Sequence, residues 1–169
     1  PQCLRIVLEY CTGTWHLLSL LNLQDTSLEM LFTPQEFCLE IDIIYSLADF
    51  WNTHLFLYDR KGITFSGVAP LGVIVLAARP VIEGVPQFTG SNLHLSQGLE
   101  ITSWQWDGTR LQFGITRPGE SDGHVTIKLH KAPKRALING RDIDWEKSQA
   151  DCYRFSVHFI QSCEVEIHC

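Results

Sequence analysis

Apolar and polar side chains alternate strictly along the last third of this chain, in residues 125–129, 153–159 and 165–167. Successive side chains of a β-strand point to opposite faces of the sheet, so a period of two residues gives a strand one apolar and one polar face. These segments therefore predict strands that bury one face and leave the other in water. No other feature of the sequence restricts the fold as strongly.

The first half of the chain is also predicted to be β. Thr33-Pro34-Gln35-Glu36 is its one helical signal, because Thr33 is a candidate cap and Pro34 suits the first helical position, and we expect one turn there at most. Elsewhere no segment of useful length shows the 3.6-residue period of a helix. The predicted strands are residues 4–9, 15–23, 39–45, 51–58, 63–68 and 73–78, with a further strand starting at Leu93 and Leu95.

Turn signals connect these strands into hairpins. Asp107-Gly108 and Asn139-Gly140 favour two-residue type I′ turns, and residues 59–62 favour a longer loop with Gly62 in the left-handed conformation. Consecutive antiparallel strands without crossover helices exclude doubly wound folds and the (β/α)₈ barrel. The sequence predicts an all-β fold, an antiparallel β-sandwich made of two packed β halves.

A connector with two prolines and a glycine, residues 79–86, separates the two halves. We predict a first half over residues 1–82 and a second half over residues 86–169. The length of 169 residues suits one ordinary domain or two small ones. Whether the halves are two domains or two sheets of one unit stays open at this point.

Composition excludes several classes of function. Hydrophobic residues make up 45% and charged residues 19% of the chain, which argues against disorder, and a net charge of −6 argues against a nucleic-acid partner. The longest apolar stretch, residues 68–78, is interrupted by Pro70 and Gly72 and is too short to cross a membrane. The chain starts at Pro1 without a basic and then apolar leader, so we expect no signal peptide and a piece of a longer protein.

The cysteines do not form a recognisable disulfide framework, although their even number is compatible with three disulfides. No CxxC pair is present to indicate a zinc site or a redox pair, so we expect mostly free thiols and a cytoplasmic protein. We expect no cofactor and no metal. The six cysteines are Cys3, Cys11, Cys38, Cys152, Cys163 and Cys169.

Trp104 and Trp106 are two residues apart, so on a strand they share one face and could stack on a sugar ring. A two-residue loop at Asp107-Gly108 places Trp106 opposite Thr109 and Trp104 opposite Leu111. The residues that continue this face are apolar. The face is therefore predicted to belong to the core, with Trp106 at the hairpin end the more exposed of the two.

Asp142 and Asp144 share a face as a paired acid and base would. The Asn139-Gly140 register places Arg135 opposite Asp144 and Leu137 opposite Asp142. We interpret this face as an outward polar surface with one cross-strand ion pair.

Other catalytic signals are weak. The chain has no GxSxG nucleophile elbow and no phosphate-binding glycine loop, although its composition leaves a Ser/His/Asp arrangement open. No set of histidines has the spacing of metal ligands. Five histidines fall on polar positions of predicted strands, where they would face water: His94, His124, His130, His158 and His168.

Four segments resemble the C-terminal β region of α-galactosidase-like (melibiase-type) glycoside hydrolases: WHLLSLLNL at 15–23, ADFW at 48–51, VAPLGVIVLAARP at 68–80 and PQFTGSNLHLSQG at 86–98. The chain departs from the pattern where it has Leu23 in place of a common Trp and Leu71 in place of a common His. The second half is similar to the terminal Ig-like sandwich of the same enzymes. The resemblance implies that the catalytic (β/α)₈ barrel, which needs roughly 250 residues, lies outside this chain. It assigns no catalytic residue to this sequence.

Two hypotheses follow from the resemblance. The first is a non-catalytic accessory domain that packs on the catalytic barrel, stabilises it and helps it to form a homo-oligomer. The second is a carbohydrate-binding module that holds a galactose-containing glycan with Trp106, Gln105, Asp107 and Arg110, since an aromatic ring and a few directed hydrogen bonds suit a sugar. A free-standing enzyme is a weaker third reading, because it needs carboxylates from distant strands to converge.

Overall fold

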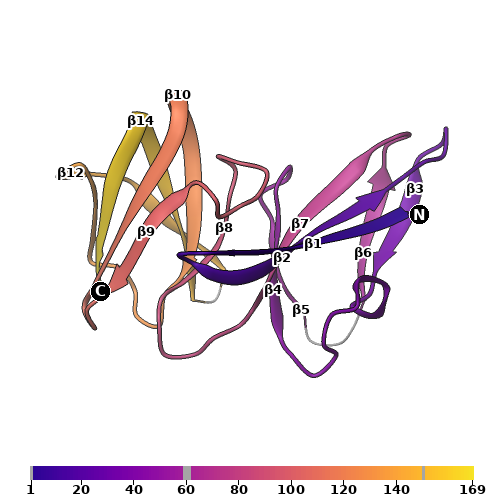
Figure 1. The fold of residues 1–169 in the computed structure, drawn as a ribbon, viewed down its shortest axis with the longest axis horizontal. Helices are drawn as coiled ribbons and strands as arrows, with labels where there is room; N and C mark the ends of the chain where they lie inside the picture. The colour runs from indigo at the N-terminus through magenta and orange to yellow at the C-terminus, as the bar shows by residue number, and fades with distance from the viewer. Residues whose placement is uncertain (1, 59–61, 150) are drawn as a thin grey trace. The chain divides into compact units, whose positions relative to one another are not determined.

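The structure is a computed structural model that describes residues 2–58, 62–149 and 151–169. The chain is all-β, and every described strand pair is antiparallel, which confirms the predicted fold class (Figure 1). The predicted loop at 59–62 falls largely on residues outside the described part. Within the described ranges, no helix is long and apolar enough to cross a membrane.

The described chain divides into two compact units. Unit 1 contains the residues up to Leu8 and Thr14–Val81, and unit 2 contains Glu9–Gly13 and Ile82–Cys169. The main boundary thus lies inside the connector at residues 79–86.

Unit 1 has seven strands: β1 (Gln2–Tyr10), β2 (Gly13–Leu21), β3 (Leu28–Phe32), β4 (Tyr45–Asp49), β5 (Leu55–Tyr58), β6 (Ile63–Val68) and β7 (Val73–Pro80). One sheet has the order β1-β2-β7-β4-β5, and β3 pairs with β6 in a second, two-stranded sheet. Leu18 and Leu20 of β2, Met30 and Phe32 of β3, and Leu76 of β7 are buried in one cluster. Apolar side chains from both sheets therefore form a common core, as in a sandwich.

Local turns overturn parts of the predicted strand pattern in unit 1. The segment 39–45 is wrong as a strand, because Pro34 starts a 3₁₀ turn (Gln35–Phe37) and Cys38 follows with a φ of 51°, so that strand β4 starts only at Tyr45. Thr33 donates a hydrogen bond to the Glu36 carboxylate at 3.1 Å but is not the N-cap, which is Pro34. Strand β3 was not predicted, and the strand predicted at 51–58 begins at Leu55.

Unit 2 also has seven strands: β8 (Gln87–Ser91), β9 (Ile101–Trp106), β10 (Arg110–Lys128), β11 (Arg135–Ile138), β12 (Arg141–Asp142), β13 (Trp145–Gln149) and β14 (Cys152–His168). They form one sheet in which the long strands β10 and β14 pair along most of their length. The register shifts between Thr116 and Glu120, where Gly119 has a φ of 75° and Gln161 of the partner strand a φ of 63°. Phe113 before this shift and Val125 after it belong to the same buried cluster. Each long strand therefore contributes buried side chains to one core, both before and after the register shift.

The alternation in residues 153–159 is confirmed in β14, where Phe155 and Val157 are buried while Ser156 and His158 are exposed. The predicted strand at Leu93 and Leu95 is wrong, because residues 92–100 form bends and turns. The Ig-like topology of this half stays a prediction.

The two hairpin predictions had different outcomes. At Asn139-Gly140 the loop has two residues, both with positive φ, and Leu137 lies opposite Asp142 as predicted. At Asp107-Gly108 the predicted register is wrong by two residues: Trp106 lies opposite Leu111, and Trp104 lies opposite Phe113. The Asp107 side chain is the cause, as described below.

Candidate functional site

The predicted sugar-binding residues lie at the end of the β9–β10 hairpin in unit 2. Trp104 and Trp106 are half-buried and pack against the core, and the Trp106 ring makes an edge contact with His130, with centroids 5.6 Å apart. Gln105 is exposed on the other face of the strand. These residues lie on one hairpin, but Gln105 points to the strand face opposite that of Trp106.

Asp107 builds the loop of this hairpin. Its carboxylate accepts hydrogen bonds from the backbone N–H of Thr109 at 2.9 Å and of Arg110 at 2.8 Å. These two bonds, with one from the Thr109 hydroxyl, lower the Asp107 pKa to about 2. The side chain binds donors at Thr109 and Arg110, and the Asp107 N–H donates to the Arg110 carbonyl at 3.2 Å, so the turn is centred on Gly108 and Thr109 and not on Asp107 and Gly108. Arg110 forms ion pairs with Asp107 at 3.4 Å and with Glu166 at 3.6 Å.

Asp142 and Asp144 line a shallow hollow of about 260 Å³ with Asp122 and His158. Arg135 forms its ion pair with Asp142, at 2.7 Å, and not with the predicted partner Asp144. The hydrogen bond and the positive charge of Arg135 lower the Asp142 pKa. A general acid needs a raised pKa, so the geometry does not favour an acid and base pair here.

A serine, a histidine and a carboxylate come together in the turn segment 92–100 of unit 2. The Ser96 hydroxyl lies 2.6 Å from His94 Nδ1, and Glu100 is 3% exposed. Glu100 accepts hydrogen bonds from the Ser91 hydroxyl, from the Ser96 hydroxyl at 3.5 Å and from the Gly98 N–H at 2.7 Å. In a catalytic triad the carboxylate orients the histidine. Here the described contacts join it to hydroxyls and backbone, so the group builds the turn.

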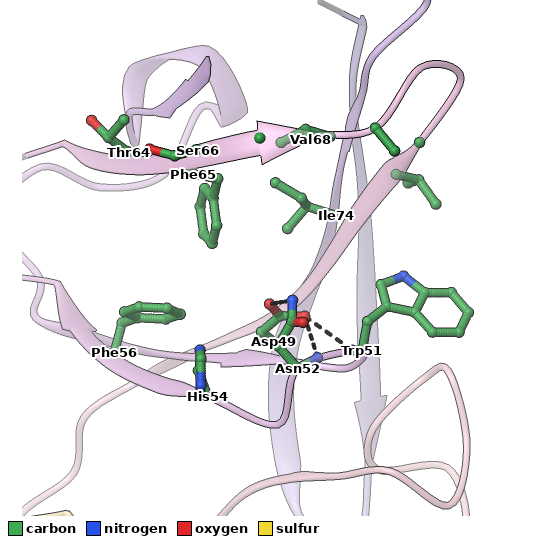
Figure 2. Close-up of a pocket in the computed structure, with 14 residues that line it drawn as sticks. Asp49, Trp51, Asn52, His54, Phe56, Thr64, Phe65, Ser66, Val68 and Ile74 are labelled. Carbon is green, nitrogen blue, oxygen red and sulfur yellow. Dashed lines mark hydrogen bonds between the residues drawn. The ribbon is translucent and has the colours of Figure 1, made fainter. Parts of the chain in front are cut away.

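A cleft in unit 1 has a volume of about 760 Å³. It is bordered by the β4–β5 turn, by β6 and by the start of β7 (Figure 2). Phe56, Phe65 and Ile74 form its apolar part, and the rings of Phe56 and Phe65 meet edge to face with centroids 5.6 Å apart. The volume falls in the range of small-molecule sites, about 300–1,000 Å³.

Asp49 shapes one wall of this cleft (Figure 2). It ends β4 and is 3% exposed. Its Oδ1 accepts hydrogen bonds from the N–H groups of Trp51 at 2.9 Å and Asn52 at 3.3 Å, and its Oδ2 accepts one from Asn52 Nδ2 at 2.8 Å. The carboxylate is therefore occupied by the turn that it builds.

The rim of the cleft combines an aromatic ring with polar groups. Trp51 is 57% exposed, and its ring meets Phe50 edge to face at 4.9 Å. Asn52 and His54 are exposed beside it. Among the described lining residues, Asp49 is the only acidic side chain, and none is a lysine or an arginine. The cleft therefore suits an uncharged ligand with both apolar and polar surface.

The sequence pattern did not identify this cleft as a site. ADFW at 48–51 entered the argument only through the family resemblance. Its cleft-forming neighbours Phe65 and Ile74 come from strands β6 and β7, and no local pattern shows that these strands lie beside the β4–β5 turn. The signal that was available is a Trp two residues after an Asp that could cap a turn.

No protein-family profile and no curated protein sequence matches this chain. Among the described residues, no group of three or more His, Cys, Asp or Glu side chains is arranged to hold a metal ion. Cys3, Cys38, Cys152, Cys163 and Cys169 are free thiols. Burial raises the pKa of Cys152 to about 11 and that of Cys163 to about 12.

Proposed function

We propose that this chain is the non-catalytic accessory β region of an α-galactosidase-like glycoside hydrolase and packs on a catalytic (β/α)₈ barrel outside the chain. The observation that carries the proposal is the apolar surface of unit 1. Eleven large apolar side chains among its described residues are more than a third exposed, and where such side chains adjoin one another they typically mark a protein interface. They are Leu4, Ile6, Val7, Leu23, Leu31, Ile41, Ile44, Trp51, Leu57, Leu71 and Val73.

Strand β1 is the part of this surface best suited to a partner. It lies at the edge of the five-stranded sheet, and Leu4, Ile6 and Val7 are 55%, 55% and 52% exposed. Ile6 and Val7 are neighbours, so apolar side chains are exposed on both faces of the strand. Covering an exposed edge strand is a common way to protect it from aggregation. A barrel packed on β1 would bury these side chains.

The motif residues behind the resemblance support a structural role. Asp49 of ADFW builds the β4–β5 turn. Asn22 of WHLLSLLNL is fully buried, and its Nδ2 donates hydrogen bonds to the carbonyls of Thr26, Val68 and Ala69 at 2.9–3.0 Å. The hydroxyl of Ser91, in PQFTGSNLHLSQG, donates a hydrogen bond to the buried carboxylate of Glu100. Glycosidases commonly need two convergent carboxyl groups, and Asp49 is the one carboxyl group among the described residues that line the cleft of unit 1.

The alternative, a carbohydrate-binding module centred on Trp106, has less support. The Trp106 ring is half-buried and in contact with His130, while Asp107 and Arg110 are engaged with each other and with the hairpin loop. We also propose that the parent enzyme is cytoplasmic, because free thiols are typical of that reducing compartment. Assembly into a homo-oligomer through the parent enzyme is likewise proposed.

The test compares this chain with the complete product of its gene, which the proposal expects to be a longer polypeptide. The longer polypeptide should hydrolyse p-nitrophenyl α-D-galactopyranoside, and the 169-residue chain should not. Ile6→Lys should lower the thermal stability of the longer polypeptide and leave the isolated chain unchanged, because Ile6 is exposed there. Ser66→Lys, at an exposed polar position of β6, is the matched control. Hydrolysis by the isolated chain, or the absence of a barrel from the longer polypeptide, would refute the proposal.

A further inference from the structure

We propose that the cleft of unit 1 binds one neutral pyranose ring of a carbohydrate, with Trp51 as the stacking residue. The site differs from the Trp106 group in unit 2 and from the edge strand β1. It does not require a catalytic barrel, so its success or failure is independent of the proposed function above.

The aromatic part of the cleft gives the first reason. Trp51 is 57% exposed, although burial of a large apolar ring is favourable. Its ring lies at one end of the cleft, and the Phe56–Phe65 pair lies at the other (Figure 2). The C–H face of a pyranose is apolar and flat, so an accessible indole is a suitable surface for it. Ile74, 7% exposed, lies between the two ends.

The polar part of the cleft gives the second reason. Asn52 uses one N–H for Asp49, and from the described residues its amide oxygen receives no hydrogen bond. His54 is exposed at the same rim and contacts Phe56 by its ring edge, at 6.1 Å between centroids. Asn52 and His54 can therefore offer both donors and acceptors to hydroxyl groups. This pattern of an apolar floor and a few polar groups is typical of small-molecule sites.

Charge selects the class of ligand. No lysine or arginine lines the described cleft, so nothing there would balance a phosphate or a carboxylate. The Asp49 carboxylate is 3% exposed and already accepts three hydrogen bonds from the turn, so little of it is accessible to a cationic ligand. An uncharged ligand with hydroxyl groups and an apolar face meets these conditions.

The test is a titration of the complete 169-residue chain, followed by backbone amide NMR shifts, with methyl α-D-galactopyranoside and methyl α-D-glucopyranoside as probes. At tens of millimolar, at least one probe should cause saturable shifts in residues 49–56 and 64–74. Trp51→Ala should weaken this binding about tenfold or more. Trp145→Ala, which removes an exposed Trp of unit 2, is the matched control and should leave binding unchanged.

The fold of each variant is checked by its thermal unfolding. Asn52→Ala is a second test, because it removes the amide and keeps the backbone donors that Asp49 accepts; it should also weaken binding. Absence of saturable shifts with both probes would overturn the proposal. So would binding that survives Trp51→Ala and is lost in Trp106→Ala, since this result would place the sugar in unit 2.

Discussion

Asp49 accepts a hydrogen bond from the backbone N–H of Trp51 at 2.9 Å, so that a buried carboxylate fixes the turn from which an exposed indole projects. Asp49 and Trp51 are two positions apart in the sequence and have different roles. Asp49 contributes to stability, and Trp51 contributes a surface for recognition.

Replacing the Asp49 carboxylate should destabilise unit 1. Asp49→Ala leaves the N–H groups of Trp51 and Asn52 without their acceptor, and we expect the free energy of unfolding to fall by about 2–3 kcal/mol. Asp49→Asn keeps one acceptor oxygen and should cost less. Urea unfolding followed by circular dichroism measures both. Equal stability of Asp49→Ala and the original chain would contradict the described turn.

Glu100 should be as important for unit 2 as Asp49 is for unit 1. It is 3% exposed and accepts from Ser91, Ser96 and the Gly98 N–H. Glu100→Gln replaces one acceptor oxygen by an NH₂ group that faces these donors, so we expect a loss of about 2 kcal/mol. Glu164→Gln, at an exposed position, is the control for loss of charge. A similar effect of both changes in urea unfolding would count against the Glu100 cluster.

The stability of unit 2 should fall on mild acidification because of His124. Burial, and after it the nearby positive charge of Arg154, lower its pKa from the ordinary 6.5 to about 4, while Glu146 acts in the opposite direction. Between about pH 6.5 and 4 the unfolded chain binds a proton here that the folded chain does not, so stability is complete above pH 6.5 and decreases as the pH falls to 4.

His124→Gln should reduce this slope, and His158→Gln, at an exposed histidine, should not. Unfolding free energies measured at several pH values check the slope, and NMR titration of the His124 imidazole checks the pKa directly. A measured His124 pKa near 6.5 would contradict the prediction, because the folded and unfolded chains would then bind the proton equally well.

The cysteine thiols should react in two groups. Cys152 and Cys163 are buried, with pKa values raised to about 11 and 12, so almost none of either is the reactive thiolate at pH 8. Cys11 and Cys38 are exposed and should react first with a disulfide reagent such as Ellman's. Cys38→Ser should reduce the amplitude of the fast phase. Mass spectrometry locates the labelled residues, and rapid labelling of Cys163 in the folded chain would contradict the prediction.

Local patterns predicted those elements whose geometry is set by neighbouring residues. Asn139-Gly140 tolerates two positive φ values in succession, so its hairpin and the pairing of Leu137 with Asp142 could be predicted. Asp107-Gly108 carries the same signal, yet the Asp107 side chain accepts hydrogen bonds from Thr109 and Arg110, and the turn is centred on Gly108 and Thr109. Two similar dipeptides thus give different registers, because a side-chain hydrogen bond competes with the turn type.

The candidate site could be predicted only in part. A polar group beside a Trp was visible at Asp49 and Trp51 in the sequence. The cleft also needs Phe65 and Ile74, which belong to strands β6 and β7. Strand pairing between segments distant in sequence depends on the whole core, so no local period could reveal these neighbours.

Trp15 and Trp51 show where the contribution of the sequence ends. Alternation and turn residues determined that the chain is all-β and antiparallel, because these signals act between residues close in sequence. Yet Trp15 is fully buried, with the Arg79 guanidinium 4.2 Å from its ring centroid, while Trp51 is 57% exposed. The tertiary structure decided this difference: burial depends on which distant strand packs over a side chain, and only the assembled sheets bring that strand into place.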